Sequence, residues 1–143
     1  MSKNKADKSK EMLQIKLSKS YITRKRNDSF NKSFVEEQFY TELLKLNRLK
    51  TIYRQYKDIK RYPYYCDFYI VEDDLFIELN THWTHGGKPY DVNDPICQKQ
   101  LAEWQEKAKT SQFYKNAIET WTIRDVEKLK IAQKNKLNYK VIY

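Results

Sequence analysis

Two carboxylates on neighbouring apolar segments are the first candidates for chemistry in this 143-residue chain. Asp67 and Glu78 lie within YPYYCDFYIVEDDLFIELN (62–80), which we predict to be two strands joined by a turn at residues 72–74. A hairpin folded about that turn places Asp67 nearly opposite Glu78. Two carboxylates facing each other in an apolar sheet are costly unless a cation lies between them, and Mg²⁺ favours such oxygen ligands. The alternative is that Asp67 pairs with a basic side chain while Glu78 faces solvent.

A second candidate is the loop that follows the Glu78 strand. Both histidines and both glycines of the chain fall within residues 82–87, HWTHGG. Loops at strand ends are where rigid scaffolds place reactive groups, and an imidazole there can act as general base toward water. The alternative for this loop is a packed Trp83 with two half-exposed histidines.

The two cysteines add a competing hypothesis. His82, His85, Cys66 and Cys97 together offer four zinc ligands, although the sequence contains no Cys-x-x-Cys pair. Neither cysteine has the context of a nucleophile. Two cysteines cannot form a disulfide framework, which is typical of proteins in a reducing compartment. A structural zinc domain with an interaction role is therefore one alternative class.

The elements that must position these residues follow the order helix, three strands, helices, strand. This order predicts an α/β domain with a small mixed central β-sheet flanked by helices. Ser33 and Glu36 form a capping-box pattern that opens a helix over 34–47, and Asp94 is placed to cap a helix over 95–109. The remaining predicted elements are a strand over 51–56, the two strands within 62–80, a helical stretch from Phe113 to Trp121, a new helix opened by a cap at Thr122 and Asp125, and a strand over 139–143.

Positive charge is concentrated at the start of the chain. Residues 1–32 hold ten lysines and arginines against three acids, in a chain whose net charge is +9. We predict a basic, flexible arm over 1–32 and an α/β domain over 33–143. Such an arm attracts polyanions such as double-stranded DNA through phosphate contacts, and a solubilising tail is the alternative. The candidate DNA contacts in the arm are Lys16, Lys19, Arg24, Lys25 and Arg26.

The apolar segments of the chain are short. None approaches the roughly 20 residues that a membrane span requires, and no apolar block follows the N-terminal lysines as in a secretory signal. We therefore expect an intracellular, cytoplasmic protein with no membrane partner.

The motifs in this order resemble the PD-(D/E)XK nuclease superfamily, and within it the very-short-patch-repair endonucleases and the related phage homing endonucleases. The pattern is a helix Glu, then Asp67 in CDFYI, Glu78 in FIELN and a histidine shortly after, and it covers about residues 33–143. The resemblance implies a restriction-endonuclease-like fold, a DNA substrate and a phage gene in a bacterial host.

The resemblance also implies roles for individual residues. Asp67 matches the central metal ligand and Glu78 the second acidic residue of the site. His85, with His82 as the alternative, matches the histidine that acts as base or contacts phosphate. The helix Glu corresponds to Glu36.

One position departs from the superfamily pattern. The expected lysine two residues after the acidic residue is Asn80, which carries no charge. By resemblance, either the histidine takes over its role or a lysine from the next helix does so, for which Lys107 is the candidate. Glu37 is the fallback for the helix Glu.

The leading hypothesis is a metal-dependent DNA endonuclease of the homing or repair type, using Mg²⁺ or Mn²⁺. Aromatic side chains such as Trp83 are candidates for insertion beside bases, with a core role as the alternative. The competing function is a non-catalytic DNA-binding module derived from a nuclease fold.

Overall fold

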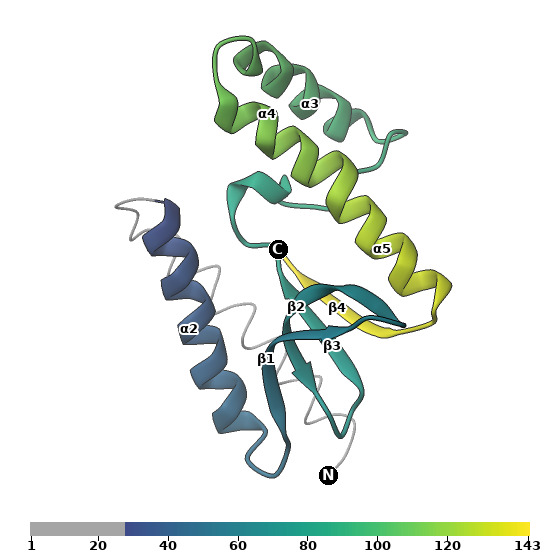
Figure 1. The fold of residues 1–143 in the computed structure, drawn as a ribbon. Helices are drawn as coiled ribbons and strands as arrows, with labels where there is room; N and C mark the ends of the chain where they lie inside the picture. Colours follow the sequence, from purple (N-terminus) through teal and green to yellow (C-terminus); the bar gives the residue numbers. More distant parts are fainter. Residues whose placement is uncertain (1–27) are drawn as a thin grey trace.

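The computed structural model describes residues 28–143 of the chain. They form a mixed α/β fold in which a four-stranded mixed sheet is flanked by helices (Figure 1), so the predicted fold class is confirmed. The elements are α2 Asp28–Leu46, β1 Ile52–Asp58, β2 Tyr62–Ile70, β3 Leu75–Leu79, the 3₁₀ turn η1 Trp83–His85, α3 Pro95–Ala108, α4 Gln112–Glu119, the π-helical turn η2 Thr120–Arg124, α5 Asp125–Lys134 and β4 Asn138–Ile142.

The sheet has the strand order β1-β2-β3-β4. Its first three strands form an antiparallel meander, and β4 then adds parallel to β3. The predicted strands and the turn between β2 and β3 are therefore confirmed. Because β3 is hydrogen-bonded on both sides, the strand that carries Glu78 lies inside the sheet, and its last two residues pair with β4.

Helix α2 begins at Asp28, six residues before the predicted start at residue 34. The capping-box pattern at Ser33 and Glu36 therefore does not mark its first turn. No glycine or proline interrupts residues 28–46, so nothing in the chain stops the helix from extending backward. The helix thus includes the last residues of the predicted arm. The arm residues proposed to contact DNA, Lys16, Lys19, Arg24, Lys25 and Arg26, lie outside the described part of the chain.

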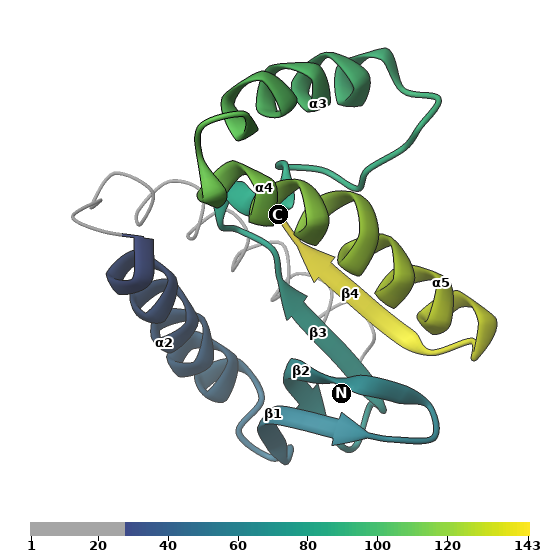
Figure 2. The ribbon, with the colours of Figure 1, turned by 45° about the horizontal axis from the view of Figure 1, so that its top comes forward.

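The two faces of the sheet are covered by different helices, as Figure 2 shows. One apolar cluster joins Phe39 and Leu43 of α2 to Phe68 of β2 and Ile77 of β3. These helix residues recur at a spacing of four, which places them on one side of α2. On the opposite face, the cluster of Phe76 and neighbouring aromatics packs against α5. The sheet is therefore a rigid, double-sided support for residues at its strand ends.

The helices after η1 enclose a third cluster, which is aromatic. Asp94 caps α3 as predicted, because its carboxylate accepts a hydrogen bond from the backbone N–H of Ile96 at 2.9 Å. The predicted cap at Thr122 is wrong. The chain continues as a helix from α4 through η2 into α5, and the Thr122 hydroxyl donates instead to the carbonyl of Ile118 at 2.6 Å. The buried members of the cluster are Cys97, Trp104, Ala117 and Trp121.

A membrane-crossing helix would need more length and apolar character than any helix within residues 28–143 possesses.

Candidate functional site

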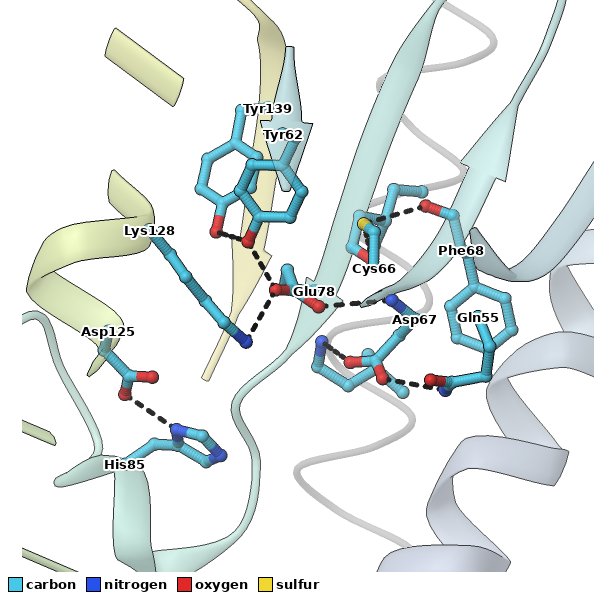
Figure 3. Close-up of polar contacts among 12 residues, drawn as sticks. Gln55, Tyr62, Cys66, Asp67, Phe68, Glu78, His85, Asp125, Lys128 and Tyr139 are labelled. Atoms are coloured by element: carbon cyan, nitrogen blue, oxygen red, sulfur yellow. Dashed lines mark hydrogen bonds and ion pairs between the residues drawn. The ribbon is translucent and has the colours of Figure 1, made fainter. Parts of the chain in front are cut away.

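The carboxylates Asp67 and Glu78 meet where β2 and β3 separate. Phe68 of β2 and Ile77 of β3 are register partners. Asp67 precedes Phe68 and Glu78 follows Ile77, so on antiparallel strands the two acids lie beyond this pair on the same side. The backbone N–H of Asp67 donates to Glu78 Oε1 at 3.1 Å, and that of Leu79 donates to Asp67 Oδ2 at 2.8 Å (Figure 3). Each carboxylate thus accepts from the backbone of the opposite strand. The predicted near-opposite placement is confirmed, and the carboxylates replace the backbone partners that a continuing ladder would supply.

Glu78 does not face solvent, so that alternative is wrong. Glu78 is a charged residue, yet it is buried, with only 4 % of its surface exposed. Its Oε2 accepts hydrogen bonds from the Tyr62 hydroxyl at 2.6 Å and from Lys128 Nζ at 3.2 Å. Burial raises the pKa of this carboxyl, Lys128 opposes the rise, and the nearby charge of Asp67 adds to it. A further cation beside Glu78 would therefore favour the ionised form of this carboxylate.

Asp67 is connected to the predicted helix Glu through an amide. Gln55 of β1 donates from Nε2 to Asp67 Oδ1 at 3.3 Å and to Glu36 Oε1 at 3.0 Å. Gln55 has a φ of 50°, a left-handed conformation that is rare for a residue other than glycine and often occurs at functional sites. The fallback Glu37 instead forms an ion pair with Arg54 at 2.7 Å. The structure therefore brings Glu36, rather than Glu37, to Asp67.

The two histidines differ in their partners. His85 Nδ1 lies 2.7 Å from Oδ2 of Asp125, the first residue of α5, and only 14 % and 8 % of these side chains is exposed. His82 Nδ1 lies 2.9 Å from the Thr84 hydroxyl within its own loop. A carboxylate at Nδ1 favours the tautomer that carries its proton there and leaves Nε2 as the basic nitrogen. His85 is therefore the histidine whose ring is held by a carboxylate.

A lysine contacts the acid pair from a helix that the sequence did not suggest. Lys128 of α5 contacts Glu78, and Figure 3 shows its ammonium group on the same side of the β3 end as the His85–Asp125 pair. The sequence candidate Lys107 is corrected, because its Nζ lies 3.4 Å from the Tyr114 hydroxyl in the helical part of the molecule and Lys128 is the lysine that contacts Glu78. Asn80 lies at the end of β3, where its backbone N–H donates to Ile142 of β4 at 2.7 Å.

A cavity of about 280 Å³ borders this group of residues. Asn80, Asp125 and Lys128 contribute to its wall, together with Tyr139 and Tyr143 of the last strand region. The Tyr139 hydroxyl lies 2.9 Å from that of Tyr62, which in turn donates to Glu78. Lys128 and Asp125 thus line this space, and Lys128 and Tyr139 connect it to Glu78, directly and through Tyr62 respectively.

The four candidate zinc ligands are not brought together. Cys66 lies in β2, where its thiol donates to the carbonyls of Phe68 and Ile77, whereas Cys97 is buried in α3 within the aromatic cluster. Within residues 28–143, no three or more His, Cys, Asp and Glu side chains are arranged to hold a metal ion by themselves. A zinc centre built from these residues therefore has no support in the described fold.

Trp83 belongs to the helical part of the molecule. Its ring lies 5.5 Å from that of Trp104 and 5.1 Å from that of Tyr114, centroid to centroid. These contacts fit the core role that the sequence left open for Trp83. A base-inserting role remains a prediction.

Sequence reasoning missed three residues of the site, namely Gln55, Asp125 and Lys128. The sequence pattern marks Asp125 only as a capping residue, and it lies 40 positions from His85 in the chain. Lys128 follows one helical turn later and lies 50 positions from Glu78. The i, i+3 spacing of Asp125 and Lys128 is the one signal that would have placed both on the same side of a helix.

No protein-family model, no curated protein and no solved structure matches this chain. The functional argument therefore depends on the geometry of the site and on the motifs of the sequence.

Proposed function

We propose that the protein is a metal-dependent endonuclease that hydrolyses phosphodiester bonds of DNA, on a restriction-endonuclease-like fold. The observation that supports this most is the convergence of an acid pair, a lysine and a carboxylate-bound histidine at one end of β3. Asp67 and Glu78 contact each other's strands, Lys128 contacts Glu78, and His85 is held by Asp125. These are the groups that phosphodiester hydrolysis requires: metal ligands, a positive charge and a base.

The acid pair fits a magnesium ion better than a metal held entirely by protein. Mg²⁺ is usually bound by one or two carboxylates together with substrate phosphates and water. Asp67 and Glu78 supply two such carboxylates, and burial raises the pKa of Glu78 in a way that a bound cation would reverse. When bound, Mg²⁺ or Mn²⁺ would supply Lewis-acid polarisation of the phosphate and would favour ionisation of a water molecule.

His85 and Asp125 would together accept the proton that the attacking water releases. Asp125 holds the Nδ1–H of His85, so that Nε2 can accept a proton from the attacking water. Asp125 also stabilises the imidazolium that this transfer creates. Lys128 would place a positive charge beside the negative charge that develops on the phosphate, a role that the uncharged Asn80 cannot perform.

The test is cleavage of supercoiled plasmid and of long genomic DNA by the full chain with Mg²⁺ or Mn²⁺. Long genomic DNA is included because the recognition sequence is not specified. We expect Asp67→Asn and His85→Ala to abolish cleavage. The matched control is Asp73→Asn, in the turn at the other end of the same hairpin, which should cut like the wild type. If the wild type binds DNA tightly and cuts neither substrate with either ion, the enzyme assignment fails and the DNA-binding alternative replaces it.

A further inference from the structure

The backbone that follows His85 lies directly against a tryptophan side chain. Gly86 has a φ of 74°, and a Cβ at this position would lie 2.3 Å from Cε2 of Trp121 and 2.4 Å from its Nε1. No side chain fits in that space, so the glycine is required here both by its backbone angle and by the indole ring. Gly87 has nearly the same φ, 76°, yet nothing lies within 4 Å of its Cβ position.

Trp121 is itself tightly held. It is 1 % exposed, and its indole N–H donates to the carbonyl of Lys88 at 2.8 Å. The amide of Gln100 donates to the carbonyl of Gly86 at 3.0 Å. The loop after His85 is therefore fixed at Gly86 and again two residues later, which leaves the imidazole little freedom relative to the indole.

Trp121 also lies in an unusual helical segment. Residues Thr120–Arg124 form a π-helical turn, and Asp125 is the first residue after it. A π turn adds one residue to the helix, which rotates all following side chains by about 100° relative to an uninterrupted α-helix. The rotation allows Trp121 to face the aromatic cluster while Asp125 and Lys128, further along the same continuous helix, face the sheet end.

We infer that Trp121 is a positioning residue for the His85–Asp125 pair, acting through its contact with the Gly86 backbone and through the π turn that aims Asp125. One side chain thereby fixes both partners of a 2.7 Å contact. The effect of this positioning on DNA cleavage rests on the proposed nuclease function. Its effect on the state of the His85 ring does not.

The experiment compares Gly86→Ala with Gly87→Ala in the full chain. Both variants carry a side chain at a left-handed φ, but only the first meets the indole. Nitrogen-15 NMR of the histidine rings reports which nitrogen of His85 carries the proton, with no DNA or metal present. We expect Gly86→Ala to lose the preference for a protonated Nδ1 and to cut DNA about 10²-fold more slowly, since small displacements of catalytic groups have effects of that size. Gly87→Ala should retain both properties.

A folded Gly86→Ala variant with the wild-type His85 spectrum would overturn the inference. If that variant does not fold, Trp121→Phe decides instead, because it keeps an aromatic ring but removes the N–H that reaches Lys88. An altered His85 tautomer in Trp121→Phe supports the inference, and an unaltered one overturns it. If the wild type cuts no DNA, the proposed function fails while the NMR comparison still decides the positioning role. If the wild type cuts DNA and both glycine variants match it, only the positioning role fails.

Discussion

Two clusters in this protein each hold two carboxylates and one cation, yet the pKa of Glu78 in one shifts in the opposite direction from the carboxyl pKa values in the other. Arg61 donates to Asp58 at 2.7 Å and to Asp74 at 2.8 Å, and these bonds hold the pKa of both carboxyls below the ordinary value of 3.8. In the second cluster, burial raises the pKa of Glu78 although Lys128 lies 3.2 Å away. The Arg61 cluster consists of Arg61, Asp58 and Asp74, and the Glu78 cluster of Glu78, Asp67 and Lys128.

Solvent access explains the difference, because the charge count is the same. The side chains of Asp58 and Asp74 are 23 % and 55 % exposed, whereas that of Glu78 is 5 % exposed. Water and a forked guanidinium satisfy the first cluster, as is usual for an ion pair that links two turns. A buried carboxylate with one ammonium partner is costly, and such sites are often functional. The comparison thus separates a structural ion pair from a candidate catalytic one.

The largest expected difference between the two clusters appears when the cation of each is removed in turn. Lys128→Met should lower cleavage by about 10²- to 10³-fold, because it deletes the positive charge beside the acid pair. Arg61→Met should leave the cleavage rate near that of the wild type. Rates of plasmid cleavage under saturating Mg²⁺ measure both effects. Lys130→Met, on the exposed side of α5, controls for general loss of positive charge on that helix; equal losses in Lys128→Met and Lys130→Met would contradict a site-specific role.

The second prediction concerns the cost of ionising Glu78. Folding raises the pKa of Glu78 above 4.5, so the folded chain binds the carboxyl proton more tightly than the unfolded chain does. The free energy of unfolding therefore falls as the pH rises above 4.5 and Glu78 ionises. Glu78→Gln should therefore raise the free energy of unfolding at pH 7. Urea unfolding measures it. The same variant should lose cleavage, and a destabilised Glu78→Gln would show that the ion pair with Lys128 outweighs burial.

The third prediction concerns the Arg61 cluster, whose contribution to the free energy of unfolding depends on pH with the opposite sign. Because Asp58 and Asp74 have lowered pKa values, their stabilisation is present above pH 3.8 and is lost as the pH falls further. Arg61→Met should remove this acid sensitivity and cost about 0.5–1 kcal/mol at pH 7, a small value because the cluster is solvated. Urea unfolding between pH 3 and pH 7 tests it. A pH profile that is the same in the wild type and in Arg61→Met would contradict the assignment.

The smallest expected effect concerns the lysine that the sequence favoured. Lys107→Ala should change the cleavage rate by less than about twofold, because Lys107 contacts Tyr114 at the surface of α3 rather than the acid pair. The plasmid assay used for Lys128→Met provides the measurement. A loss as large as that of Lys128→Met would reverse the assignment of the two lysines.

Local patterns were enough to predict the fold class and the acid pair. The turn at residues 72–74 fixes the register of β2 and β3, so Asp67 and Glu78 could be paired from the sequence. Helix α2 extended beyond its prediction because a capping pattern at Ser33 does not prevent a helix from starting earlier.

The remaining parts of the site depend on contacts between distant residues. The choice between His82 and His85 is made by Asp125, which no local pattern connects to either histidine. Lys128 is one of many lysines in the chain, so its type carries little information. The left-handed φ of Gln55 and the π turn of Thr120–Arg124 are backbone features that residue preferences do not favour, and such departures concentrate at functional sites.

The central place of β3 in the sheet has a consequence for biosynthesis. Its β2 partner precedes it in the chain, whereas its β4 partner follows α5. During synthesis the ribosome therefore releases both carboxylates before it releases Asp125 and Lys128. A nascent or prematurely terminated chain would carry Asp67 and Glu78 without the partner of His85 or the lysine. The candidate site can therefore be completed only after α5 has emerged from the ribosome.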